Sequence, residues 1–437
     1  MCTINNNKII DFFRNIIVGI ALSIIMLNLG AALGILSGRG AFAGMLSAGL
    51  IAIITSAFGG TRIQGSGLTA PMSTVTALVV AFSLEQLPQE ISGISADHFV
   101  NIVLMLTALL MFVSGLLKIG RFISYVPTLV ISGFMCGIAM IIWFLQINLL
   151  IGFNTTPIQG NVIMNISIAL ATFIIAFVTP LFFKQFSSPV FRFLPGSLIA
   201  LIGVSYTAYV LQLPVEYINI QTHAKSLDSL KTLIASQIPT VISWEIIMLA
   251  LPFSFKLAAL CYIDTLLTSL IIDKMRGETS RRNKELIAQG TAVAAVSLIG
   301  GVPGAQSTVP SILTLKEGAT SRIAGIAAGC FVIIGVLLLA DLMNNIPKAV
   351  FCGILLKVGY DIFDFKPFSA YMRTLKRSFG KRTSRIMGHK EMTVMSGTAL
   401  ITAFVDLIAA VGIFTFAYHF FNKLNQKHRL LFDYVPK

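Results

Sequence analysis

One long apolar run in this sequence carries an aspartate near its middle. The run extends from Ile246 to Ile272, and its only charges are Lys256 and Asp264. A run of that length can cross a bilayer as a helix. A charge at the centre of such a helix costs about 3 kcal/mol even on the lenient insertion scale, so Asp264 should face a protein or water-filled interior and have a partner. The run therefore predicts a membrane helix with a functional carboxylate.

The composition extends this interpretation to the whole chain. Hydrophobic residues make up 56% of the 437 residues and charged residues 11%, a balance that soluble domains do not have. The net charge of +14 would suit a nucleic-acid partner, but the basic residues lie in short loops between apolar runs, as the positive-inside rule expects. We therefore expect a polytopic membrane protein that binds no nucleic acid. The five cysteines form no CxxC pair, so we expect no cofactor.

The apolar runs and the loop charges together predict fourteen spans in the cytoplasmic (inner) membrane, with both termini in the cytosol. With that topology an acidic loop over residues 85–97 falls outside the cell. Four basic segments fall inside: 118–121, 184–192, 274–284 and 366–390. The last of them has apolar residues at helical spacing and predicts an amphipathic helix on anionic membrane lipid.

Two of the predicted spans are too short to cross a membrane. One helix runs from Pro71 to about Ser83 and another ends at about Leu315, so each has roughly half of the ~20 residues that a crossing needs. Each follows a glycine-rich stretch, 61–71 or 302–310, that is expected to be extended rather than helical. Proline in a first helical turn supports both helix starts.

The two short helices belong to a crude internal repeat. Gly59-Gly60 followed by Thr69-Ala70-Pro71 recurs as Gly300-Gly301 followed by Thr308-Val309-Pro310. The copies lie about seven spans apart, and an odd number of spans forces opposite orientations. We therefore predict an all-α polytopic membrane fold. Its 14 transmembrane segments form a 7+7 inverted repeat, in which spans 3 and 10 are half-helices preceded by short extended stretches.

Two half-helices that start from opposite sides of a membrane aim their N-termini at each other. Each N-terminus brings free backbone N–H groups and about half a positive charge, so the gap between them suits an anion. We expect hydroxyl and amide donors from the two stretches to bind it: Gln64, Ser66, Thr69, Gln306, Ser307 and Thr308. The alternative is a helix break kept only for close packing.

The carboxylate in the long apolar run has a hydroxyl one helical turn away. Asp264 and Thr268 lie four residues apart and would share one face of a helix. Oxygen ligands of this kind suit a hard cation such as Na+, and the carboxylate alone can carry a proton. We interpret the pair as a coupling-ion site, with Na+ and H+ as alternatives.

Three segments resemble the SulP family of anion permeases and exchangers. Gly59 to Met72 is similar to the family pattern GG…Q-x-S-G-P-T-x-P-M, Asn283 to Gly290 to N-R/K-E-L-x-x-Q-G, and Gly300 to Ala305 to GG-x-P-G-A. The resemblance covers nearly the whole chain. It implies a transmembrane transporter domain over residues 1–425 and a short cytosolic tail over 426–437.

The resemblance also implies alternating access. A core of spans 1–4 and 8–11, about 12–119 and 243–342, would move against a gate of spans 5–7 and 12–14, about 121–214 and 345–422. Substrate would lie between the N-termini of spans 3 and 10, and the family habit is a homodimer. The cytosolic STAS domain that relatives usually append is absent up to Lys437; it was lost, is a separate chain or was truncated.

Within the family, the segment Ile263 to Ser269 is most similar to the sodium-dependent bicarbonate transporters. The resemblance places Thr69 and Ala70 near the bicarbonate. It implies Na+ at Asp264, Thr268 and Thr308, within a cation-coupling set of Asp264, Thr268, Gln306, Ser307 and Thr308.

Three places depart from the family pattern. Leu68 stands where the family has a proline, and Pro310 where many relatives carry an arginine, so a fixed cation expected beside the anion is missing. Asn28 and Leu29 replace the proline and the polar pocket residue that are common in the first span.

The sequence thus predicts a secondary active transporter of a small inorganic oxyanion, best described as a Na+-coupled bicarbonate symporter embedded in membrane lipid. A sulfate or other anion permease, coupled to H+ or exchanging anions, is the alternative. A nucleobase permease of the same architecture is a remote one, because such proteins place acidic residues against the base, whereas the breaks here are rich in Gly, Ser and Thr. No HExxH spacing or nucleophile elbow supports an enzyme.

Overall fold

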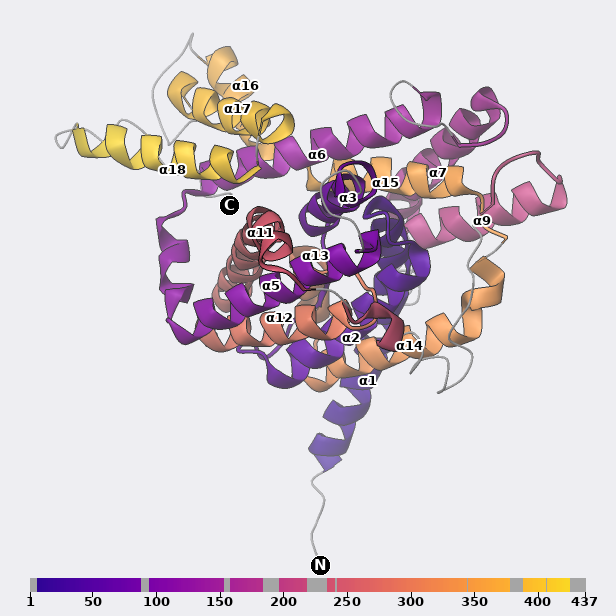
Figure 1. Ribbon diagram of the computed structural model, residues 1–437, viewed down its shortest axis with the longest axis horizontal. Coiled ribbons are helices and arrows are strands. Elements are labelled where there is room, and N and C mark those ends of the chain that lie inside the picture. Colours follow the sequence, from indigo (N-terminus) through magenta and orange to yellow (C-terminus); the bar gives the residue numbers. More distant parts are fainter. Residues whose placement is uncertain are drawn as a thin grey trace, which may run out of the picture. The chain divides into compact units, whose positions relative to one another are not determined.

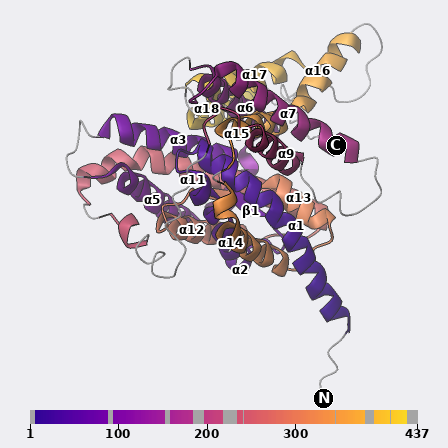
Figure 2. The same ribbon diagram turned by 90° about the vertical axis from the view of Figure 1, so that its right-hand side faces the viewer.

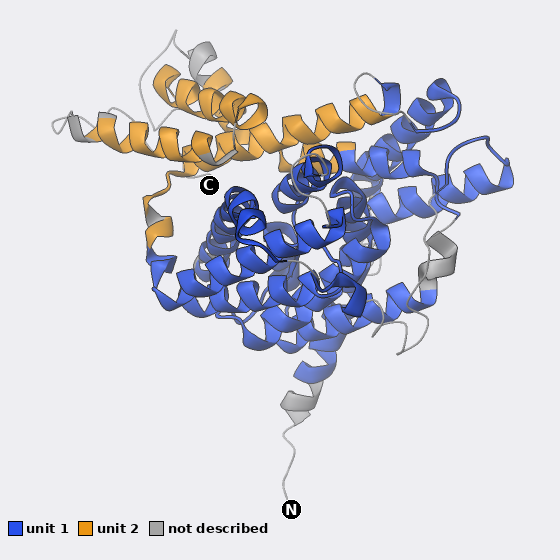
Figure 3. Ribbon diagram, in the orientation of Figure 1, with its two compact units in different colours: residues 1–121, 150–355 blue, residues 122–149, 356–437 orange. Residues whose placement is uncertain are grey.

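The computed structural model describes residues 6–87, 94–152, 158–183, 196–217, 234–239, 242–343, 345–377, 388–405 and 407–424. This part of the chain is almost entirely helical (Figure 1). The chain forms two compact units, residues 1–121 with 150–355 and residues 122–149 with 356–437 (Figure 3). The predicted basic loop 184–192 and the predicted tail 426–437 lie outside the described residues.

The first unit holds most of the long helices. Their bounds in chain order are α1 (Asn6–Leu36), α2 (Ala41–Phe58), α3 (Ala70–Glu85), α5 (Ala96–Leu116), α7 (Val162–Phe183), α9 (Gly196–Val210), α11 (Trp244–Arg276), α12 (Arg282–Ser297), α13 (Thr308–Lys316) and α14 (Ile323–Met343). A further helix, α15 (Lys348–Ile362), begins in the first unit and ends in the second. Each of these helices lies within or mostly within the residue ranges predicted for the core and gate spans.

Several described helices are long and apolar enough to cross a membrane. Six satisfy both criteria: α1, α2, α5, α6 (Thr128–Ile151), α7 and α11. Shorter apolar helical stretches occur at Ala70–Glu85, Gly196–Val210, Ile323–Leu338 and Ala409–Phe420. The structure therefore shows many apolar helices, while the number of crossings and the inverted repeat stay predictions. Compactness does not test which helices move together, so the division into core and gate also stays a prediction.

The two predicted helix breaks are present. The stretch before α3 contains strand β1 (Ser66–Leu68), and the stretch before α13 contains strand β2 (Gly304–Gln306). The strands pair antiparallel in the register Ser66↔Gln306, Gly67↔Ala305 and Leu68↔Gly304. Because antiparallel strands end at opposite ends of their ribbon, α3 and α13 begin on either side of it, and Figure 2 shows both helices around β1. The sequence predicted extended stretches but not that they pair with each other.

Glycines allow the elements of the first unit to approach closely. A Cβ on Gly304 would lie 2.1 Å from the carbonyl oxygen of Gly67, so the two strands approach this closely only because residue 304 has no side chain. A Cβ on Gly44 of α2 would lie 2.1 Å from the carbonyl oxygen of Gly30 in α1. Small residues of this kind are the usual means by which membrane helices pack. α1, α2 and α14 pack against one another, and α1 and α2 also contact β1.

The second unit contains α6, the end of α15, α16 (Phe365–Arg377), α17 (His389–Phe404) and α18 (Leu407–Leu424). Its core joins α6 to α17 through Leu129, Cys136, Met395 and Ala399, with Phe368 of α16 packed against them. Within the predicted segment 366–390 the structure shows a helix over the residues of α16, and residues 378–387 lie outside the described residues. The amphipathic contact of this helix with lipid stays a prediction.

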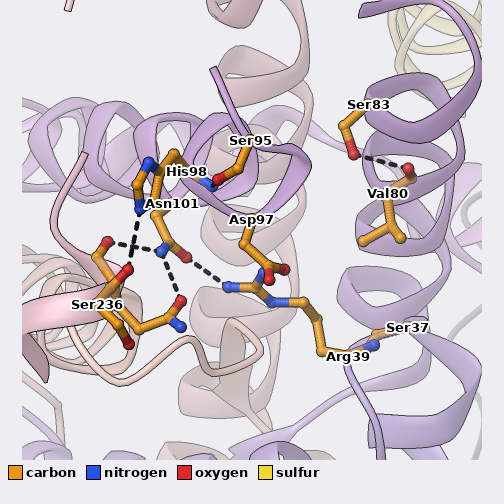
Figure 4. A network of polar contacts seen from close by, with 10 residues as sticks. Ser37, Arg39, Val80, Ser83, Ser95, Asp97, His98, Asn101 and Ser236 are labelled. Carbon is orange, nitrogen blue, oxygen red and sulfur yellow. Dashed lines mark hydrogen bonds and ion pairs between the residues drawn. The ribbon is translucent and has the colours of Figure 1, made fainter. Parts of the chain in front are cut away.

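A polar cluster, here named the Arg39 network, ties the turn between α1 and α2 to α5 (Figure 4). The Arg39 guanidinium pairs with Asp97 at 2.5 Å and donates a second hydrogen bond to the side chain of Asn101. Asn101 in turn donates to the backbone and side-chain oxygens of Gln237 at 2.8 and 2.9 Å. His98 contacts the backbone oxygen of Ser236 at 2.9 Å. The network therefore holds the segment 234–239 against the start of α5.

Candidate ion-binding site

The starts of both half-helices meet one face of α11. Thr69, the residue directly before α3, donates its hydroxyl hydrogen to a carboxylate oxygen of Asp264 at 3.0 Å. The hydroxyls of Thr268 and Thr308, the latter at the start of α13, lie 2.7 Å apart. Asp264 and Thr268 are separated by about 6 Å of helix rise. The structure therefore places Thr69 against Asp264 and Thr308 against Thr268. Binding of Na+ or an anion by these residues stays a prediction.

The caps of the two half-helices leave their first turns open. The N-cap residues are Thr69 for α3 and Ser307 for α13, and neither side chain caps its own helix. In α3 the Thr69 hydroxyl donates to Asp264 and accepts no hydrogen bond from the first turn. The free N–H groups of a first helical turn bind anions, and each helix adds a partial positive charge there. The geometry can therefore hold an anion between two sets of backbone N–H donors without a charged side chain.

The Asp264 carboxylate has no cationic partner in the described part of the chain. Its one hydrogen bond comes from Thr69, and the side chain is half-buried. An acidic side chain at membrane depth normally pairs with a cation or lines an ion path. The residues at this site fit a hard cation, because the Asp264 carboxylate and the hydroxyl groups of Thr268 and Thr308 offer oxygen ligands.

Gln306 links the second break to α11. It is fully buried, its side-chain oxygen accepts from the Ser269 hydroxyl at 2.7 Å, and its backbone N–H donates to the Thr265 hydroxyl at 3.4 Å. Its neighbour Ser307 donates its backbone N–H to the carbonyl oxygen of Gly65 at 3.1 Å. These contacts fix the position of β2 relative to α11 and to β1. A ligand role for Gln306 and Ser307 stays a prediction.

The predicted anion ligands in the first break have protein partners. The Gln64 amide donates to the backbone oxygen of Thr55 at 2.6 Å, and Ser66 donates to the Gln64 side-chain oxygen at 3.2 Å. Both side chains are buried. Ala70 contributes only backbone to the first turn of α3. In this conformation Gln64 and Ser66 hold the break to the end of α2, and anion binding by these residues stays a prediction.

Sequence reasoning did not identify the role of Glu285 in α12. This carboxylate is fully buried and accepts the backbone N–H of Thr61 at 2.8 Å and the side-chain amide of Gln289 at 3.3 Å. Gln289 also donates to Ser66 at 3.3 Å. The available signal was the spacing: Glu285 and Gln289 lie four residues apart, on one face of a helix that is otherwise mostly apolar.

The structure also explains Gly59-Gly60. A Cβ on Gly59 would lie 2.7 Å from a Glu285 carboxylate oxygen, and one on Gly60 would lie 2.0 Å from the carbonyl oxygen of Arg281. The glycines therefore let the turn before β1 lie directly on the start of α12. The sequence analysis placed them only in the internal repeat and in the family pattern.

Comparison with known proteins gives a consistent result. The profile of the Sulfate permease family matches residues 12–380. The bicarbonate transporter BicA of Picosynechococcus is 30% identical over 428 residues, which cover 94% of this chain and 70% of the relative. The putative sulfate transporter YvdB of Bacillus subtilis is 26% identical over 429 residues, covering 96% and 75%.

Solved structures show the same fold. The transmembrane domain of a cyanobacterial bicarbonate transporter BicA superposes with a TM-score of 0.76 at 28% identity, covering 92% of this chain and 98% of that one. A structure of SLC26A9 gives a TM-score of 0.70 at 16% identity, covering 95% and 66%, and at that identity it supports the fold alone.

Proposed function

Because the chain belongs to the sulfate permease family and is an integral membrane anion transporter rather than an enzyme, we propose that it is a Na+-coupled bicarbonate symporter. It works by alternating access between a core and a gate, with fourteen spans in a 7+7 inverted repeat. It lies in the cytoplasmic membrane with both termini in the cytosol and assembles as a homodimer.

One observation carries the proposal: α11 places a carboxylate, which has no cationic partner among the described residues, against the start of one helix and a hydroxyl one turn later against the start of another. The N-cap side chains of these two helices make no capping hydrogen bond. Asp264 contacts the start of α3, and Thr268 one turn later contacts the start of α13. A bound Na+ neutralises Asp264, and the helix N-termini hold the anion beside it. Each ion lowers the electrostatic free energy of the other, so their binding is reciprocal, which is the requirement for symport.

The charge of the site supports bicarbonate over sulfate. The first turn of α13 carries the buried Pro310, so it supplies backbone dipoles but no side-chain cation. Dipoles at two helix ends together amount to about one positive charge. A singly charged anion is balanced by that charge, whereas a doubly charged sulfate is not. The BicA relatives are named bicarbonate transporters, and YvdB is named a putative sulfate transporter, so the similarity includes both anions.

The test is uptake of radiolabelled bicarbonate and of sulfate into proteoliposomes, each with and without an inward Na+ gradient. We expect the Na+ gradient to raise bicarbonate uptake by about tenfold or more, in the range of typical coupling energies, and to leave sulfate uptake at background. Sulfate uptake driven by a pH gradient without Na+ would establish the alternative, an H+-coupled permease in which Asp264 carries the proton. Equal uptake under all gradients would contradict coupling altogether.

A further inference from the structure

A second carboxylate in the first unit is buried without a cation. Glu285 lies in the first turn of α12, is fully buried, and makes no ion pair in the part of the chain that the structure describes. Both of its oxygens are used. One accepts the backbone N–H of Thr61 at 2.8 Å, and the other accepts the Gln289 amide at 3.3 Å. A buried acid that accepts from both donors holds them in place, because a buried N–H group that loses its acceptor is left unpaired at a cost in free energy.

The turn that Glu285 holds is built to lie against α12. Arg281 donates its backbone N–H to the Gly60 oxygen at 3.4 Å, so the turn and the helix start also contact through backbone atoms. A side chain at Gly59 or Gly60 would collide with Glu285 or Arg281. The position of Thr61 is therefore set by α12, although the two segments are 224 residues apart in sequence.

From Thr61 a chain of hydrogen bonds leads to the candidate cation site. The Thr61 hydroxyl lies 3.1 Å from the Ser269 hydroxyl, and Ser269 donates to the side-chain oxygen of Gln306 at 2.7 Å. Ser269 directly follows Thr268 on α11. Gln306 precedes Ser307 and Thr308 at the start of α13. This series of hydrogen bonds therefore reaches the sequence neighbours of both Thr268 and Thr308.

We propose that Glu285 is a positioning residue for the coupling cation. By fixing Thr61, its carboxylate holds Ser269 of α11 and Gln306 of β2 in register, so that the oxygen atoms of Thr268 and Thr308 stay close enough to bind one ion. Glu285 touches neither ion. The inference rests on the proposed Na+ coupling and adds to it the residue that keeps the site assembled.

The experiment compares four single variants and one double variant in bicarbonate uptake measured as a function of Na+ concentration. Glu285→Gln keeps the shape but has a single acceptor oxygen, and Thr61→Val keeps the backbone N–H while removing the hydroxyl. Each should raise the half-saturating Na+ concentration by about three- to tenfold, the equivalent of one hydrogen bond. Thr61→Ser keeps the hydroxyl and should behave like the unmodified protein. The maximal rate and the bicarbonate KM at saturating Na+ should be unchanged in all three.

The fourth variant is a matched control in the second unit. Glu391 is also a buried acid in a first helical turn, and it accepts the backbone N–H of Gly388 at 3.0 Å. Glu391→Gln should leave the half-saturating Na+ concentration unchanged. If Glu285 acts through Thr61, the double variant Glu285→Gln/Thr61→Val should show no more than the larger of the two single effects.

The outcomes separate this proposal from the proposed function. Loss of maximal rate with an unchanged half-saturating Na+ concentration in Glu285→Gln and Thr61→Val would show a merely structural role and overturn the positioning proposal alone. Additive effects in the double variant would overturn the path through Thr61. If the unmodified protein and Asp264→Asn showed the same Na+-independent uptake, the proposed coupling and this inference would both fail.

Discussion

Two polar clusters of the first unit differ in how their charges are compensated. One is the Arg39 network, and the other, here named the α11 site, comprises Asp264 and Thr268 of α11 with Glu285 of α12. In the Arg39 network a buried guanidinium pairs with Asp97 and donates a second hydrogen bond to the side-chain oxygen of Asn101, while its Nε has no hydrogen-bond partner in the described part of the chain. Burial lowers the pKa of the Arg39 guanidinium, and the neighbouring Asp97 carboxylate opposes that shift. At the α11 site the carboxylates of Asp264 and Glu285 have only neutral partners among the described residues.

The difference indicates which cluster is complete within the protein. A cation with an anion beside it needs no further counter-charge, so the Arg39 network has the properties of a structural contact. A carboxylate among hydroxyls and amides leaves negative charge uncompensated at membrane depth. Under the proposed coupling, a bound cation or proton supplies the charge that the α11 site lacks. Matched substitutions in the two clusters test this contrast.

The largest effect is expected from neutralising one acid in each cluster. Asp264→Asn removes the charge that would bind Na+, and losing a charged partner of a desolvated ion costs about 3 kcal/mol or more, which corresponds to about a hundredfold in affinity. Na+-driven bicarbonate uptake should therefore disappear. Asp97→Asn, at a side chain that is 68% exposed, should leave the Na+ dependence intact. Uptake assays at several Na+ concentrations check both, and Na+-driven flux that survives in Asp264→Asn contradicts the assignment.

The sequence was informative about the α11 site where the signals were local. The breaks at residues 59–71 and 300–310 were evident because glycine and proline disfavour a continuous helix. The shared face of Asp264 and Thr268 followed from helical periodicity. Both features depend on neighbouring residues along the chain, so a single sequence contains them.

The partners across the fold could not be predicted in this way. Thr69 was expected beside the anion, and the structure shows its hydroxyl donating to Asp264, 195 residues later. The pairing of β1 with β2 and the contact of Glu285 with Thr61 are likewise long-range. Such contacts arise from how helices pack, and short polar stretches allow many alternative pairings. A buried acid in a first helical turn also looks like ordinary compensation of the helix dipole.

The second prediction concerns the hydroxyl pair between α11 and α13. Thr268→Val removes a candidate oxygen ligand and should raise the half-saturating Na+ concentration by about tenfold, whereas Thr268→Ser should retain it. Thr107→Val is the matched control, because Thr107 is a fully buried threonine of α5 whose hydroxyl bonds backbone oxygens of Val103 and Ser254. Na+ titrations of uptake distinguish them. An unchanged Na+ requirement in Thr268→Val would leave Thr268 as a packing contact of α13.

The third prediction addresses the structural cluster. Arg39→Met removes the donor to Asn101 and leaves buried polar atoms unpaired, which should lower the free energy of unfolding by about 1–3 kcal/mol. Thermal unfolding of the detergent-solubilised protein measures the loss, with Asp97→Asn as a milder comparison. The half-saturating Na+ concentration should stay the same in the protein that remains folded. A shift in Na+ affinity would show that the two clusters are energetically coupled.

The smallest effect is expected at a third charged contact, a pair that is balanced and partly exposed. Burial alone would raise the pKa of Glu216, but hydrogen bonds from Lys348 and from the Gln159 backbone lower it below its ordinary value of 4.5. Because the pKa is lower in the folded protein than in the unfolded chain, the carboxylate stabilises the fold above about pH 4.5, and this contribution is lost as the pH falls through the lowered value.

An exposed pair of this kind contributes about 0.2–1 kcal/mol. The unmodified protein should therefore lose slightly more thermal stability between pH 6 and pH 4 than Glu216→Gln, with no change in the Na+ requirement of transport at pH 7. The other carboxylates titrate equally in both proteins, so the difference between the two melting curves isolates Glu216. An identical pH dependence would show that the contact with Lys348 adds nothing measurable to the stability of the fold. Glu216 differs in this from Asp264, for which we propose a bound cation as partner.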